Sequence, residues 1–191
     1  SFAQLQGSNN QSLVGDFGPE FGLAVRWMRE TSSGNLYLQK EAESGVSISY
    51  FAPASGTGIA AFSRTASAVA WLAANGHQLS AKGWLWVQGE ADAGVAQATY
   101  QAALQEIVDA LLAGTQMDVG SISVLTQMRV GASTYAVGVA DAKAAIAAAS
   151  PSIIKTISIA YDDGVHAGGR GQVQLGYDAF EKLFGARHIA T

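Results

Sequence analysis

The segment GWLWVQGEADAG, residues 83–94, decides the fold of this chain. It opens with an apolar run that holds two tryptophans and ends in polar side chains, among them Gln88, Glu90 and Asp92. An unbroken apolar run is typical of a strand covered on both faces, as in a parallel sheet. Ligands of such sheets bind beyond the carboxyl ends of the strands. The segment is therefore either a buried strand that delivers polar groups to a site, or a core strand followed by an ordinary polar loop.

The rest of the chain repeats this strand character, with helical patterns in between. The predicted strands are residues 35–40, 83–89, 121–128 and 152–160. The helical patterns cover residues 19–30, 63–75, 95–112, 134–149 and 171–184. This alternation predicts a three-layer α/β/α domain, with a mostly parallel sheet of four or five strands in flavodoxin-like order. No repeat or linker divides the chain, so residues 1–191 are predicted to form a single domain.

Apolar stripes predict which helix faces are buried. The predicted stripe of the first helix is Phe21, Ala24, Val25 and Met28. The predicted stripe of residues 95–112 is Tyr100, Leu104, Ile107, Val108 and Leu111. Trp27 and Trp71 are likewise predicted to be core residues on helix faces rather than platforms for sugar stacking.

Composition excludes several classes of function. Hydrophobic residues make up 49% of the 191, which indicates a globular chain. The absence of cysteine excludes a disulfide scaffold, a thiolate zinc site and a cysteine nucleophile. A net charge of −4 with 11 basic residues and no basic stripe argues against nucleic acid as a partner. No apolar run reaches the ~18 residues of a membrane helix, and Ser1 opens into polar sequence, so neither a membrane span nor a signal peptide is expected.

The sharpest chemical pattern follows the last predicted strand. Asp163 and His166 form a D-x-x-H arrangement, in which one turn brings a carboxylate oxygen to one ring nitrogen. That bond selects the tautomer and leaves the other nitrogen free to act as a base. The alternative is a surface loop whose acids cap the following helix. A cation bound by Asp162, Asp163 and His166 is a weaker alternative, because a metal site needs more clustering, so no metal is predicted.

Two other motifs do not carry a function. GTGIAA, residues 56–61, fits a dinucleotide fingerprint on paper, but no acidic residue lies about 20 residues further on. No G-x-S-x-G nucleophile elbow is present, which argues against the α/β-hydrolase arrangement. No cofactor is therefore predicted.

Four blocks resemble a known family. WVQGEAD within residues 83–94 resembles the W-x-Q-G-E-x-D block of the SGNH hydrolases, specifically carbohydrate acetylesterases similar to sialate O-acetylesterase. The other three similar blocks are FGPEFGLAVRWM (17–28), LQKEAESGVSI (38–48) and DDGVHAGGRGQVQLGYDAF (162–180). The four blocks run in the family's order, which makes them more specific together than any is alone.

The resemblance implies a function and a role for each site residue. His166 would be the general base and Asp163 the acid that orients it. The backbone N–H of Gly45 and the side-chain amide of Gln88 would donate to the oxyanion, and Glu90 would hold Gln88 in place. The implied function is a serine esterase that removes O-acetyl groups from a carbohydrate through an acyl-enzyme. The alternative is a catalytically degenerate glycan-binding module of the same fold.

The family's nucleophile block has no clear counterpart. The family places its serine in a G-Q-S-N block after the first strand, whereas here QGSNN (6–10) carries Ser8 in a different order, after a poor strand. We therefore expect the nucleophile and the first strand to lie outside the 191 residues, and this chain alone to be inactive. The missing strand would be supplied by a further segment or by self-association. An extracellular, virion or cell-surface location is expected for a glycan esterase.

Overall fold

The computed structural model describes eight parts of the chain. They are residues 18–31, 34–43, 45–79, 82–114, 122–129, 137–151, 154–160 and 169–185. The elements are, in order, α1 (Pro19–Glu30), the 3-10 helix η1 (Ile48–Phe51), α2 (Gly56–Ala74), β1 (Gly83–Trp86), the 3-10 helix η2 (Glu90–Asp92), α3 (Gln97–Gly114), β2 (Ile122–Arg129), α4 (Val137–Ala149), β3 (Ile154–Ala160) and α5 (Gly169–Phe184).

The described strands form one parallel sheet in the order β1-β2-β3. Trp86 of β1 pairs with Leu125 of β2, which in turn pairs with Thr156 of β3. The α/β class and three of the four predicted strands are confirmed. The strand predicted at residues 35–40 is wrong, so the described sheet has three strands instead of four or five.

Residues 34–43 form an extended segment outside the described sheet, and their apolar side chains pack against helices instead of against neighbouring strands. Leu36 and Leu38 pack against the cluster formed by α1 and α5. Alternating apolar residues suit an extended segment lying on such a cluster as well as a strand in a sheet, so the pattern alone could not separate the two.

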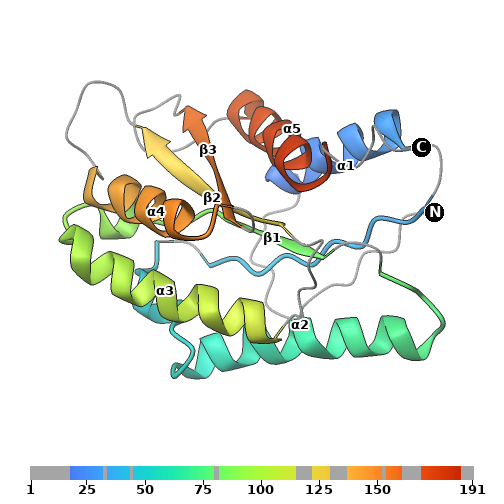
Figure 1. Cartoon of the computed structure of the whole chain (residues 1–191), viewed down its shortest axis with the longest axis horizontal. Coiled ribbons are helices and arrows are strands. Elements are labelled where there is room, and N and C mark those ends of the chain that lie inside the picture. Colours follow the sequence, from blue (N-terminus) through green and yellow to red (C-terminus); the bar gives the residue numbers. More distant parts are fainter. Residues whose placement is uncertain are drawn as a thin grey trace.

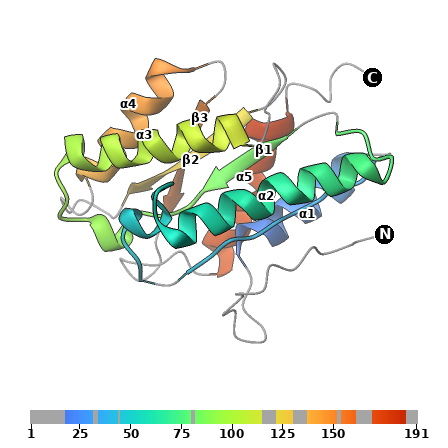
Figure 2. The same cartoon turned by 90° about the horizontal axis from the view of Figure 1, so that it is seen from below.

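Helices cover both faces of the described sheet (Figures 1 and 2). Successive residues of a strand point to opposite faces. Accordingly, Trp84 and Trp86 pack against the cluster under α3 and α4, whereas Leu85 and Val87 pack against the cluster of α1 and α5. The unbroken apolar run at residues 83–87 is explained by this coverage on two faces.

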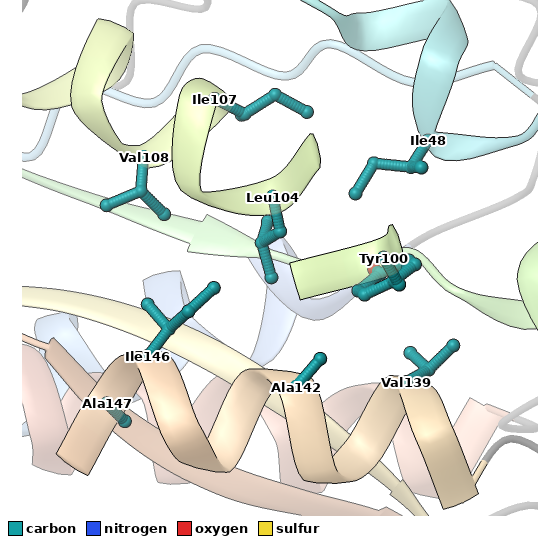
Figure 3. Packing of buried hydrophobic residues seen from close by; sticks show 9 residues of the cluster. All are labelled: Ile48, Tyr100, Leu104, Ile107, Val108, Val139, Ala142, Ile146 and Ala147. Carbon is teal, nitrogen blue, oxygen red and sulfur yellow. The ribbon is translucent and has the colours of Figure 1, made fainter. Parts of the chain in front are cut away.

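The larger core cluster lies between α3 and α4 and includes Ile48 of η1 (Figure 3). The predicted α3 stripe is confirmed: Tyr100, Leu104, Ile107 and Val108 are buried, and Leu111 is partly buried. The facing buried residues of α4 are Val139, Ala142, Ile146 and Ala147. Because this cluster also contains Ile48, it holds the 45–51 segment against the end of the sheet.

α1 and α5 cross at two glycines, and this crossing corrects the predicted α1 stripe. A Cβ on Gly22 would lie 2.2 Å from the Val173 carbonyl oxygen, and one on Gly176 would lie 2.1 Å from the Pro19 carbonyl oxygen. The face of α1 that contains Gly22 is therefore the buried one. Phe21 and Met28 of the predicted stripe are instead 52% and 53% exposed.

The two helix tryptophans have different surroundings. Trp27 packs edge-on against Phe184 with ring centroids 5.3 Å apart, as expected of a core residue. The prediction for Trp71 is wrong, because its side chain is 54% exposed and stacks beside His77. α2 lies on the outside of α3 and η1. Among its described side chains, residues 63–74, Leu72 alone is buried.

Candidate functional site

The predicted site lies at the carboxyl ends of the strands. β1 ends at Trp86, two residues before Gln88. β3 runs parallel to it through β2 and ends at Ala160, so both strands finish at one edge of the sheet. Asp163 and His166, the predicted acid and base, follow β3 in the sequence but lie outside the described residues, as does Ser8. The described part of the chain therefore contains the oxyanion side of the predicted site.

Gln88 is buried and held by hydrogen bonds at both ends of its amide. Its Nε2 donates to Asp92 Oδ2 at 2.6 Å and to the Val46 carbonyl oxygen at 3.2 Å. Its Oε1 accepts from the Tyr100 hydroxyl at 2.9 Å. A flipped amide would place Oε1 against two acceptors, so these partners determine that Nε2 faces Asp92 and Val46 and that Oε1 faces Tyr100. The amide is rigidly held, with its hydrogens directed at Asp92 and Val46.

The Gly45 loop lies against Gln88. Gly45 has φ +69°, in the left-handed region that favours glycine, and it directly precedes the Val46 that accepts from Gln88. The structure thus brings the loop of one predicted oxyanion donor into contact with the side chain of the other.

Asp92 connects the Gln88 side chain to the loop that follows Gly45. It is 3% exposed, and its Oδ2 accepts both from Gln88 and from the backbone N–H of Ile48, the latter at 2.8 Å. Gly89 has φ 144°, which lets the chain turn into η2 and bring Asp92 back towards Gln88. Glu90, which the family resemblance implied as the support of Gln88, is partly exposed at the start of η2, and its role stays a prediction.

Tyr100 and Lys143 also belong to this site, although the sequence analysis did not assign them to it. Lys143 of α4 has no exposed surface, and its Nζ donates to the main-chain oxygen of Gln88. Burial lowers the pKa of Lys143 to about 7, against the opposing effect of the carboxylates of Glu90 and Asp92. Burial also raises the pKa of the Tyr100 hydroxyl above its usual range, so it remains a donor.

A signal for Lys143 was present in the sequence. It lies in the otherwise apolar helix VGVADAKAAIAAA, four residues after Val139 and three before Ile146, and so on the buried face. A lone lysine at such a position must find an acceptor inside the protein, because an unpaired buried ammonium is costly.

The Lys143 environment predicts a pH dependence of stability. Between about pH 7 and 10.5, the unfolded chain holds a proton that folded Lys143 has released. The free energy of unfolding should therefore rise with pH in this window, by up to about 1.4 kcal/mol per pH unit from this group. Lys143→Met, which has a side chain of similar length, should lack this rise. Urea denaturation of both proteins from pH 7 to 9 measures it, and parallel profiles would contradict the assignment.

Two absences apply to the described ranges alone. They hold no group of three or more histidine, aspartate or glutamate side chains that could bind a metal ion. None of the helices within them is both long and apolar enough to cross a membrane.

A protein-family model matches this chain. The family model described as "SASA: Carbohydrate esterase, sialic acid-specific acetylesterase" matches residues 4–184, nearly the whole chain. No curated protein and no solved structure shows significant similarity to the chain. The match covers all four blocks and every residue of the candidate site.

Proposed function

Because the chain belongs to the SASA family of carbohydrate esterases, the sialic acid-specific acetylesterases, we propose that it is a serine esterase that removes O-acetyl groups from a carbohydrate through an acyl-enzyme. The family implies a hydrolase whose substrate is an acetylated carbohydrate. The observation that most supports the ester chemistry is the buried, rigidly held Gln88 amide beyond the carboxyl end of β1.

In the proposed reaction, a serine oxygen attacks the acetyl carbonyl carbon and passes its proton to His166, which Asp163 orients. The carbonyl oxygen becomes an oxyanion, to which Gly45 N–H and the Gln88 amide donate. Collapse of this intermediate expels the sugar oxygen, which takes the proton from His166 and leaves as a hydroxyl. Water then attacks the acetyl-serine carbonyl and passes its proton to His166, and the serine oxygen leaves with that proton as acetate is released. Each oxyanion donor of this kind typically lowers the barrier by about 3 kcal/mol.

The nucleophilic serine has two candidate locations. From the order of the blocks we place it outside the 191 residues. Ser8 is the alternative, because the family match begins at residue 4 and so includes it. Glu90, as a support of the Gln88 loop, is also carried over from the family block alone.

We expect the full-length protein to release acetate from p-nitrophenyl acetate and from O-acetylated sugars, and Ser8→Ala to leave the rate within about twofold. A loss of about 10³-fold or more in a folded Ser8→Ala protein would assign the nucleophile to Ser8. Binding of acetylated sugar with no acetate release by the full-length protein would contradict the esterase and identify a glycan-binding module instead.

A further inference from the structure

Both hydrogens of the Gln88 amide are already donated in the described structure. One goes to Asp92 Oδ2 and the other to the Val46 carbonyl oxygen. An oxyanion can therefore receive a hydrogen bond from this amide only if one of the two present acceptors gives way. Which acceptor gives way determines what each of these residues does in the reaction.

The two bonds are unequal. The bond to Asp92 is 2.6 Å long, ends on a carboxylate and is buried. The bond to Val46 is 3.2 Å long, ends on a neutral carbonyl and is partly buried. Charge-assisted bonds are shorter and roughly twice as strong as neutral ones. The Val46 bond is therefore the weaker of the two, and it is the one nearer the Gly45 loop.

One oxygen atom of Asp92 also fixes the loop that faces Gln88. Asp92 Oδ2 accepts from the Ile48 backbone N–H at 2.8 Å as well as from Gln88. Ile48 lies three residues after Gly45 and is itself buried in the α3–α4 cluster. A single acceptor atom thus sets the position of the Gln88 amide relative to the Gly45 loop.

We propose that Asp92 is a positioning residue that keeps the two oxyanion donors in register, and that the Val46 carbonyl holds the Gln88 hydrogen that the substrate oxygen takes over. The inference rests on the proposed esterase function. The Asp92 bond persists through the reaction, while the Val46 bond is exchanged for one to the developing oxyanion.

Tyr100 and Lys143 act on the opposite side of the same residue. The Tyr100 hydroxyl holds Gln88 Oε1, and the Lys143 side-chain nitrogen holds the Gln88 main-chain oxygen. Together with Asp92 they leave Gln88 no freedom to rotate when the Val46 bond breaks. This rigidity is what preorganised stabilisation of an oxyanion requires.

The kinetic test uses the full-length protein and p-nitrophenyl acetate, with Asp92→Asn and Asp92→Ala each made in wild-type and Gln88→Ala backgrounds. Asn can place one oxygen where Oδ2 lies, so Asp92→Asn should keep kcat within about threefold. Asp92→Ala should lower kcat about 10²-fold with KM within twofold. In the Gln88→Ala background, Asp92→Ala should cost less than about threefold. Asp109→Ala, an exposed aspartate on α3, is the matched control.

A purely structural Asp92 would give a different result. If the loss from Asp92→Ala were the same with and without Gln88, or if Asp92→Asn were as slow as Asp92→Ala, the proposal would be overturned.

A second measurement tests the role of Asp92 without relying on esterase activity. In ¹H–¹⁵N spectra, the Gln88 side-chain amide should show two resolved, slowly exchanging protons in the wild type and in Asp92→Asn, and lose them in Asp92→Ala. If the full-length protein released no acetate, the esterase proposal would fail, and this signal would still decide the role of Asp92. An unchanged Gln88 signal in Asp92→Ala overturns the inference.

Discussion

Replacing His166 by alanine in the full-length protein is expected to lower kcat for acetate release by about 10⁴-fold. A serine hydroxyl is a weak nucleophile until a neighbouring base takes its proton, and His166 is the residue predicted to take it. KM should change little, because the base acts on the reacting hydroxyl and not on sugar binding. The measurement is the initial rate over a range of substrate concentrations.

His77→Ala is the matched control. His77 lies before the amino-terminal end of β1, where its Nδ1 is 2.9 Å from the Tyr37 hydroxyl. Its removal should leave kcat within about twofold. A His166→Ala protein as fast as the wild type, or equal losses in the two variants, would show that the D-x-x-H block does not supply the base.

Gly176→Ala is expected to destabilise the protein by about 3 kcal/mol, which is large for one added methyl group. The new Cβ would lie 2.1 Å from the Pro19 carbonyl oxygen and 2.5 Å from the Leu23 amide nitrogen, so α1 and α5 would have to move apart. Both contacts are with backbone, which cannot turn aside as a flexible side chain can. Thermal denaturation should show a midpoint lower by roughly 10 °C, given the usual scaling for a chain of this size.

Gly94→Ala is the control for this experiment. Apart from its two chain neighbours, no atom of the described residues lies within 4 Å of a Cβ at Gly94, so the change in stability should stay within about 0.5 kcal/mol. Alanine is the better helix former, so a Gly176→Ala protein at least as stable as the wild type would mean that helix propensity outweighs the contact. That result would contradict the close crossing of α1 and α5.

The sequence predicted the parts of the fold that depend on local patterns. The strand β1 and the stripe of α3 were readable because the apolar residues of each pack against the core clusters at the spacing that a strand or a helix requires. In the predicted α1 stripe Ala24 is buried, but Phe21 and Met28 are exposed because the buried face is set by backbone contact at Gly22, and a glycine carries no hydrophobic signal. The prediction that Trp71 is a core residue was wrong because the position of α2 outside α3 depends on tertiary packing, which the helix pattern does not show.

The sequence predicted which kinds of residue form the candidate site better than it predicted which of them contact one another. The family block singled out Gln88, but the choice between Glu90 and Asp92 as its partner depends on how η2 turns, which the spacing alone does not determine. Tyr100 and Lys143 come from two helices that are distant in the sequence, and only the folded chain shows that both reach Gln88. The predictions for Asp163 and His166 stay predictions, because both lie outside the described residues.

The bonds from Gln88 and Asp92 back to residues 46 and 48 close a long excursion of the chain. The bond between Gln88 and Val46 joins residues that are 42 positions apart in the sequence, and the bond between Asp92 and Ile48 joins residues that are 44 positions apart. All of α2 lies between them in the sequence. Closing such a loop costs about 3 kcal/mol of chain entropy, but doubling its length would add only about 0.6 kcal/mol. The oxyanion side of the site therefore depends on where this excursion begins and ends much more than on its length, and an insertion in the exposed turn after α2, residues 75–76, should leave it in place.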